Sequence, residues 1–378
     1  MACLVQEVLG VANKHGFRTF WFKIHKWLGI GLALLVMPLS LSGSALVWHD
    51  WLDDAGNPKR NIAGNGEAIL KPSAYIHAAR SSLDNGQPVA SLRFNEGHAA
   101  IVGAGSGLRA QRTNVWIDPA NAKVLDVAAG DAGLYRKMHA FHDSLFIPRI
   151  GRTVVGWLGV AMLLSSLTGL WLWWPTAGSV VRGMRWRRAK DTYTNLHHQA
   201  GFWICIPLGM LSFTGIWITF SSFFAMLSGD VQLNQAERAA RMWAKPLVAT
   251  TTSVDAATAA ALANQPGKLV SIVWPTDFDA KWRFWVEHSD KVIEVTVMDA
   301  TGATKRVGES DPDQEPGGIA RIMRQMHDGA GMGLPWQIAI FIGGIMPVLL
   351  GITGLVMWWR SRGWRADVSR RMNDRKAA

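Results

Sequence analysis

Four stretches that contain no Asp, Glu, Lys or Arg constrain the fold of this chain more than any other feature. They cover residues 27–49, 153–174, 199–227 and 336–359. Because an α-helix rises about 1.5 Å per residue, each stretch is long enough to cross a bilayer core of ~30 Å. Trp27 and Trp48 lie near the two ends of the first stretch, and tryptophan side chains anchor helices at membrane surfaces. The sequence therefore predicts a membrane α-helical protein with four transmembrane helices.

The basic residues indicate the orientation of these helices and argue against a nucleic-acid partner. The net charge is +11, but residues 1–26, 175–197 and 360–378 together hold 16 Lys and Arg against 4 Asp and Glu. Basic residues flank membrane helices on their cytoplasmic side. We therefore expect both termini and the 175–197 connection to be cytoplasmic, in a bacterial inner membrane whose lipid surrounds the helices. The two long segments, 50–150 and 228–335, are then periplasmic.

The first and third predicted helices share one pattern of residues. Gly43 follows His25 by 18 residues, and Gly215 follows His197 by 18 residues. Eighteen residues are about five turns of helix, so each glycine shares the face of its histidine near the opposite membrane surface. The repetition indicates that the two helices occupy equivalent places in the fold.

The second and fourth predicted helices also match. Both end in the sequence TGLxxWW, at residues 168–174 and 353–359, and a Met-His pair that contains His139 or His327 precedes each of them. The simplest interpretation is two tandem two-span repeats. Since each repeat crosses the membrane twice, the copies have the same orientation and are related by an axis along the membrane normal.

Each segment between paired helices is predicted to form a small α+β module. In the first segment we expect a helix at 73–84 and strands at 89–94, 99–102, 115–117 and 123–127. In the second we expect a helix at 254–263 and strands at 269–274, 282–287 and 292–298. Alternating apolar residues and Asp-containing turns favour these strands. Trp274, Trp282 and Trp285 form either the core of the second module, which we favour, or a ligand-binding surface.

These features resemble the PepSY-associated transmembrane family. The similarity lies in the HKWLG sequence at His25–Gly29, the paired exported modules and the TGLxxWW helix ends, and it covers roughly residues 20–365. Within this family, the four-span arrangement is similar to the ferrisiderophore reductases of Gram-negative inner membranes. The resemblance implies PepSY-like modules in the periplasm and a ferric siderophore as the substrate.

Four repeated histidines are candidate axial ligands of two haem groups. His25 and His197 lie at the cytoplasmic ends of the first and third helices, and His139 and His327 lie at the periplasmic ends of the second and fourth. Neutral imidazole is a common ligand of haem iron, and two facing helices can each supply one. A single histidine of this kind is usually an interfacial or packing residue, but recurrence at matched places favours ligation. Without a Cys-x-x-Cys-His motif, the groups would be two non-covalent haem b molecules.

Four glycines are predicted at the depths of these histidines. Gly43 and Gly215 lie near the periplasmic pair, and Gly169 and Gly354 lie near the cytoplasmic pair. They either leave room for a macrocycle in the helical core or let the helices pack closely, as small residues do in membranes. Both interpretations stay open.

Three further histidines compete for the ligand roles. His198 neighbours His197 but points about 100° away from it on the helix. His142 follows His139 by three residues and shares its face, so either of the two is a candidate ligand. His49, at the end of the first helix, is a third candidate for the periplasmic site, a weak metal-binding group together with Asp50, Asp53 and Asp54, or a polar cap at the membrane surface, which we favour.

Together these features predict a dihaem inner-membrane reductase. Electrons from an unidentified donor would enter at the cytoplasmic His25/His197 site, pass to the His139/His327 site and reduce ferric siderophore iron in the periplasm, which releases Fe(II). Two alternatives stay open. One is a haem-containing subunit that passes electrons to a protein partner, and the other is a haem-free PepSY-type protein that is anchored in the membrane and binds or regulates an exported protein.

Overall fold

The chain divides into two compact units. The helical unit contains Met1–His49, Met138–Phe224 and Ile322–Ala378, and the sheet unit contains Asp50–Lys137 and Ala225–Arg321. The computed structural model describes residues 2–60, 62, 70–84, 86–95, 97–105, 112–177, 179–186, 189, 191–228, 240, 243–289, 291–309 and 318–377. Three basic residues of the predicted cytoplasmic connection, Arg187, Arg188 and Lys190, lie outside the described residues.

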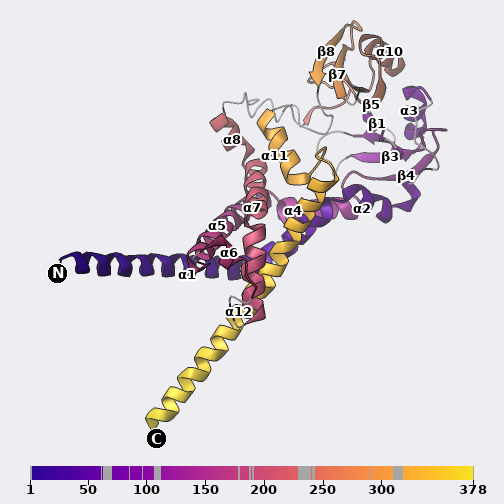
Figure 1. Cartoon of the computed structure of the whole chain (residues 1–378). Coiled ribbons are helices and arrows are strands. Elements are labelled where there is room, and N and C mark those ends of the chain that lie inside the picture. The colour runs from indigo at the N-terminus through magenta and orange to yellow at the C-terminus, as the bar shows by residue number, and fades with distance from the viewer. Residues whose placement is uncertain are drawn as a thin grey trace. The chain divides into compact units, whose positions relative to one another are not determined.

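Four long helices make up most of the helical unit (Figure 1). They are α1 (Ala2–Leu46), α5 (Gly151–Ala177), α7 (Thr192–Thr219) and α12 (Leu334–Ala377). The parts long and apolar enough to cross a membrane are Gly16–Leu46, Gly151–Trp174, Thr192–Thr219 and Leu334–Gly363. The four predicted transmembrane helices are therefore confirmed. The third begins and ends earlier than the predicted 199–227, because α7 covers Thr192–Thr219 and a separate helix, α8 (Ser221–Ser228), follows.

The two crossings α1–α12 and α7–α5 are built in the same way. A Cβ on Gly344 of α12 would overlap Oγ of Ser44 on α1. A Cβ on Gly159 of α5 would lie 3.1 Å from Cγ1 of Ile216 on α7. The two glycines are 185 positions apart and their two partners are 172 positions apart, which are the separations of the TGLxxWW sequences and of the predicted cytoplasmic histidines. Small residues thus bring the helix backbones together at corresponding places in the two halves.

Two shorter helices lead into α5 and α12. α4 (Leu134–Ser144) precedes α5, and α11 (Gly318–Asp328) precedes α12. The turn after α4 places Leu145 at φ 53° and Phe146 at φ 59°, whereas the turn after α11 uses Gly329 at φ 81°. Glycine adopts this left-handed conformation freely, but the conformation costs an ordinary residue about 1–2 kcal/mol. The reversals bring the last turn of α4 to α1 and the last turn of α11 to α7.

An eight-stranded antiparallel sheet forms the sheet unit (Figure 1). Its strands lie in the order β4-β3-β2-β1-β5-β6-β7-β8. They are β1 (Val89–Arg93), β2 (Ala100–Ala104), β3 (Thr113–Ile117), β4 (Val124–Ala129), β5 (Lys268–Val273), β6 (Lys281–His288), β7 (Lys291–Met298) and β8 (Thr304–Glu309). Two backbone hydrogen bonds flank the pairing of the central strands β1 and β5. They run from Phe94 N–H to the Val270 carbonyl at 2.8 Å and from Trp274 N–H to the Ala90 carbonyl at 3.0 Å. The two predicted modules therefore form one sheet, because each first strand would otherwise present an unpaired edge.

Two helices lie on the same face of this sheet. α3 (Pro72–Arg80) packs on β1–β3, α10 (Val254–Asn264) packs on β6–β8, and the two helices contact each other. Shorter elements occupy the connections of the two units: α2 (His49–Gly56), η1 (Pro58–Arg60) and α6 (Val180–Gly183).

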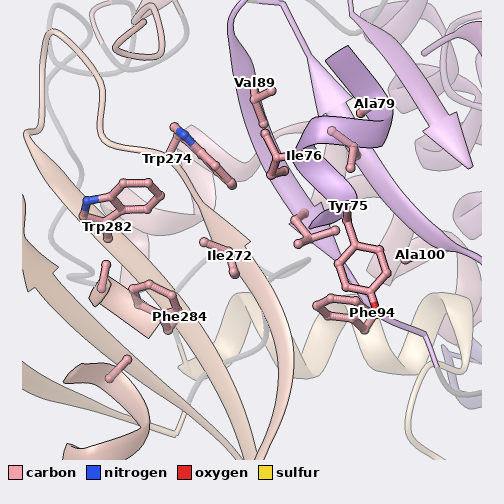
Figure 2. Packing of buried hydrophobic residues seen from close by; sticks show 14 of the residues in the cluster. Tyr75, Ile76, Ala79, Val89, Phe94, Ala100, Ile272, Trp274, Trp282 and Phe284 are labelled. Atoms are coloured by element: carbon pink, nitrogen blue, oxygen red, sulfur yellow. The ribbon is translucent and has the colours of Figure 1, made fainter. Parts of the chain in front are cut away.

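Residues from both halves share the core of the sheet unit (Figure 2). Tyr75 from the first half and Ile272 and Trp282 from the second are each 0% exposed. The rings of Trp274 and Trp282 lie 4.9 Å apart, and Nε1 of Trp282 donates a hydrogen bond to Asp299 Oδ1 at 2.9 Å. All three tryptophans considered in the sequence are buried. The core interpretation is therefore confirmed for Trp274 and Trp282, which belong to this cluster of buried residues, whereas Trp285 is buried outside it.

Candidate functional site

Two histidines at one end of the helical unit pack directly against glycines. We call His25 of α1 and His197 of α7 the inner pair. A Cβ added to Gly169 of α5 would lie 3.0 Å from Cε1 of His25, and one added to Gly354 of α12 would lie 3.5 Å from Cε1 of His197. The two glycines predicted near this pair of histidines therefore do lie beside it. Gly169 leaves little room for a side chain beside the His25 ring, whereas a Cβ at Gly354 would make an ordinary van der Waals contact with the His197 ring.

Two further histidines have the same arrangement on the helices that precede α5 and α12. We call His142 of α4 and His327 of α11 the outer pair. A Cβ on Gly43 of α1 would lie 2.5 Å from Cε1 of His142, and one on Gly215 of α7 would lie 3.1 Å from Cε1 of His327. All four glycines expected near histidines thus contact an imidazole ring.

The Nδ1 atoms of the inner pair are held by the helix that carries the glycine. His25 Nδ1 lies 3.1 Å from the Ser165 carbonyl oxygen and 3.1 Å from Thr168 Oγ1. His197 Nδ1 lies 3.0 Å from Thr353 Oγ1, and its ring has a further hydrogen bond with the backbone of Leu350. Each carbonyl lies four residues before the glycine, and each hydroxyl lies one residue before it.

The outer pair repeats these contacts. His142 Nδ1 lies 2.9 Å from the Leu39 carbonyl oxygen and 3.4 Å from Ser42 Oγ. His327 Nδ1 lies 3.1 Å from the Leu211 carbonyl oxygen and 3.0 Å from Thr214 Oγ1. The carbonyl four residues before a glycine and the hydroxyl one residue before it therefore hold all four rings.

These contacts determine which ring nitrogen carries the proton. A backbone carbonyl only accepts hydrogen bonds, so a ring nitrogen that faces one must be the donor. The hydroxyls at these sites donate their own hydrogen to carbonyls of their own helix, as Thr353 Oγ1 does to Leu349 at 2.8 Å and Thr214 Oγ1 does to Met210 at 2.9 Å. Their oxygens are then acceptors for Nδ1–H. Each neutral ring consequently has its lone pair on Nε2, the atom that can bind a metal ion.

The rings of the outer pair lie next to each other. Their centroids are 6.2 Å apart and their planes are inclined by 43°. Two imidazoles that bind one metal ion from opposite sides at about 2.0–2.1 Å, with roughly 1.1 Å between each nitrogen and its ring centre, have ring centres about 6.3 Å apart. The observed spacing matches this value. The inner pair is also close enough for its members to interact electrostatically.

The outer pair is held in the uncharged form that a metal ligand requires. Burial lowers the pKa of His142, and burial together with the neighbouring His142 lowers the pKa of His327 to about 4. Both rings are therefore neutral near pH 7.

The structure places His142 rather than His139 beside His327, and His142 is the alternative that the sequence leaves open. His139 is exposed and lies one turn earlier on α4. His142 and His327 are 185 positions apart, as are Thr168 and Thr353, whereas His139 and His327 are 188 apart. The separation of the TGLxxWW sequences therefore contained the signal for the correct pair.

The two remaining candidate ligands, His198 and His49, lie beside the paired histidines or their neighbours. His198 is partly buried and interacts electrostatically with its neighbour His197. The contacts with Thr353 and Gly354 are made by His197. His49 is exposed at the start of α2, within electrostatic range of Asp328. Among the described residues, the close glycine contacts at histidine rings belong to the four paired rings.

The Ser and Thr residues whose hydroxyl oxygens accept the hydrogen bond from Nδ1–H were not predicted from the sequence. They are Ser42, Thr168, Thr214 and Thr353. Each stands directly before one of the four glycines, so a recurring Ser-Gly or Thr-Gly pair was the available signal. That signal was weak, because hydroxyl residues in membrane helices usually bond to their own backbone.

The fold and the paired histidines define a four-span membrane protein with a discontinuous α+β unit. The family model for the PepSY-associated TM region matches residues 22–361. The match covers most of the 378 residues, and the chain belongs to this family. A comparison with curated proteins found no match.

Proposed function

We propose that this chain is a dihaem membrane reductase that carries electrons across the inner membrane to ferric siderophores in the periplasm. The observation that supports this proposal most strongly is the fourfold repetition of one histidine arrangement. In each case Nδ1–H is bound by a carbonyl and a hydroxyl, and the ring rests on a glycine. Packing histidines do not require the same three partners at four sites, whereas axial ligands do require a fixed tautomer and ring position.

The residues present fit two non-covalent haem groups. His25 and His197 would ligate one iron, and His142 and His327 would ligate the other. A bis-histidine haem supplies a one-electron carrier whose potential depends on its ligands and surroundings. The chain itself holds each ring through its Nδ1 contacts, which leaves the lone pair on Nε2, and it surrounds both sites with apolar helices. The exposed His139 is the candidate that this geometry favours least for the outer iron.

The orientation in the membrane follows from charge. The basic residues in the first part of α1, between α5 and α7, and at the end of α12 favour the cytoplasm, and the sheet unit would then be periplasmic. The separations of 172 and 185 positions support an origin from two tandem two-span repeats. Reporter fusions after Arg185 and after Ser289 should report opposite compartments. If both report the same side, the proposed topology is wrong.

The substrate class rests on the resemblance to ferrisiderophore reductases. Siderophores hold Fe(III), a hard cation, through oxygen ligands. One electron delivered by the chain, originally from a cytoplasmic donor, would reduce Fe(III) to Fe(II). The chelate binds Fe(II) less tightly, so the metal is released. This reaction forms or breaks no covalent bond of the protein and needs no side chain as a nucleophile.

The experiment that tests the proposal is absorption spectroscopy of the purified full chain in detergent. We expect two b-type haems per chain with low-spin bis-histidine spectra, and we expect oxidation of the dithionite-reduced protein by a ferric siderophore. A colourless preparation from haem-replete cells would favour the haem-free alternative. Two haems that ferric chelates fail to oxidise would favour electron transfer to a protein partner.

A further inference from the structure

Four buried hydroxyl groups lie inside the transmembrane helices, one at each histidine. Their residues are 8%, 7%, 0% and 2% exposed for Ser42, Thr168, Thr214 and Thr353. A buried hydroxyl without a hydrogen-bond partner costs about 1–3 kcal/mol. Each of these groups avoids that cost by donating to a carbonyl three or four residues back in its own helix. The hydroxyl oxygen still has a lone pair, which faces Nδ1.

A buried hydroxyl in one of these helices hydrogen-bonds to its own helix without contacting a histidine Nδ1. Ser212 of α7 is 8% exposed and donates to the Leu208 carbonyl at 2.8 Å, two residues before Thr214. Own-helix bonding alone therefore does not explain why a hydroxyl directly precedes all four glycines. The feature that the four share, and Ser212 lacks, is a histidine Nδ1 within 3.0–3.4 Å.

We propose that Ser42, Thr168, Thr214 and Thr353 are positioning residues that hold each paired histidine in the Nδ1–H tautomer and tune its Nε2 as a ligand. Donation from Nδ1–H increases the electron density on Nε2 and fixes the ring orientation. A more basic ligand stabilises the oxidised metal ion and lowers its reduction potential. The tautomer part concerns the chain alone, and the ligand part rests on the proposed function.

The distances rank the four hydroxyls. Thr353 and Thr214 lie 3.0 Å from Nδ1 and Thr168 lies 3.1 Å away, whereas Ser42 lies 3.4 Å away. A hydrogen bond weakens as this distance grows. Thr353 should therefore have a large influence on its ring and Ser42 the smallest.

The test compares Thr353→Val with Thr353→Ser and with the control Ser212→Ala, all in the full chain. Valine keeps the branched shape of threonine but cannot accept a hydrogen bond, and serine restores the hydroxyl. In haem-free protein, ¹⁵N NMR of labelled histidine rings reports the tautomer of His197. We expect Thr353→Val to lower the ratio of Nδ1–H to Nε2–H roughly fivefold, which is about 1 kcal/mol at 1.36 kcal/mol per factor of ten. Thr353→Ser and Ser212→Ala should leave the ratio near the wild-type value.

Redox titration of the haem-loaded protein is the second measurement. Thr353→Val should raise the midpoint potential of one haem and leave the other unchanged, and Thr353→Ser should reverse the shift. If Thr353→Val does not accumulate in the membrane, Thr214→Val makes the same comparison at His327. Unchanged tautomer and unchanged potentials would overturn the inference. If the wild-type chain contains no haem, the proposed function fails and the NMR measurement alone decides the tautomer question.

Discussion

Gly43→Ala should disrupt the outer site more than any other glycine replacement near a paired histidine. The new Cβ would lie 2.5 Å from Cε1 and 3.0 Å from Nδ1 of His142. Carbon atoms do not approach so closely, so the ring must move. Movement stretches the 2.9 Å contact between Nδ1 and the Leu39 carbonyl. The replacement therefore affects the ring position and its hydrogen bond together.

The magnitude follows from three contributions. Overpacking in a well-packed interior costs about 1–3 kcal/mol. Loss of the Nδ1 hydrogen bond adds about 0.5–1.5 kcal/mol. Alanine is better than glycine inside a helix by about 0.5–1 kcal/mol, which offsets part of the cost. The net effect is a loss of about 0.5–4 kcal/mol in the free energy of unfolding. Because the displaced His142 ring no longer holds Nε2 in the same position, haem binding at the outer site should weaken as well.

The other three glycines provide a graded series with its own control. The corresponding Cβ distances are 3.0 Å for Gly169, 3.1 Å for Gly215 and 3.5 Å for Gly354. The last is an ordinary van der Waals contact. Gly354→Ala should therefore retain its haem and be as stable as the wild type or slightly more so. Gly169→Ala and Gly215→Ala should be intermediate.

The assay is the haem-to-protein ratio of each purified variant, followed by the rate of haem loss to a scavenger protein. Redox titration assigns the loss to one of the two haems. The order of loss should follow the order of the distances. If Gly354→Ala loses as much haem as Gly43→Ala, or if Gly43→Ala keeps both haems with unchanged exchange rates, the steric reasoning is refuted.

Three further predictions concern the outer histidines and the sheet unit. His142→Ala should remove one haem, whereas His139→Ala should keep both, as measured by haem content; the opposite result would return the ligand role to His139. In the haem-free chain, the lowered pKa of His327 means that the unfolded state binds a proton below about pH 6.5 while the folded state stays neutral until about pH 4. Stability should therefore fall by up to about 3 kcal/mol over this range, and His327→Gln should flatten the pH profile measured by thermal unfolding. Burial favours the protonated form of Asp299, but hydrogen bonds from its neighbours dominate and lower its pKa, so its stabilisation is present above about pH 4 and is lost below it. Asp299→Asn should lower the free energy of unfolding of the sheet unit at pH 7 by about 1.5–3 kcal/mol through loss of charge-assisted hydrogen bonds, and its melting temperature should fall accordingly. An unchanged melting temperature would contradict this account.

The sequence was sufficient for the helices because their causes are local. Each span is a run of apolar residues that no other environment satisfies as well as a bilayer. The depth of the glycines also followed from local geometry, since 18 residues of helix return to the same face. For this reason Gly43 and Gly215 were expected at the level of the periplasmic histidines before their contacts were known.

The pairing of the two halves of the sheet was not predictable in the same way. β1 and β5 are separated by more than 170 residues, including two transmembrane helices. Their alternating apolar residues indicate strands but not which neighbour each strand joins. Leu92 and Ile272, which face each other across this pair, would be equally suitable in two separate modules. The shared sheet depends on both modules being held in the same chain, and the local residue pattern of a strand does not predict that pairing.

The position of His142 shows which kind of sequence match predicts structural equivalence. Aligning the two Met-His pairs requires three extra residues between His139 and α5, relative to the second half. Three residues advance a helix by about 300° and 4.5 Å, so the rest of α4 would meet its neighbours in a different phase. The match at 185 positions needs no insertion from His142 to the end of α5, and it preserves the phase of both the ring and the span. A continuous register through a helix and its following turn is therefore better evidence of spatial equivalence than a shared pair of residues. By the same reasoning Arg324 corresponds to His139, and the exposed position of both side chains agrees with that correspondence.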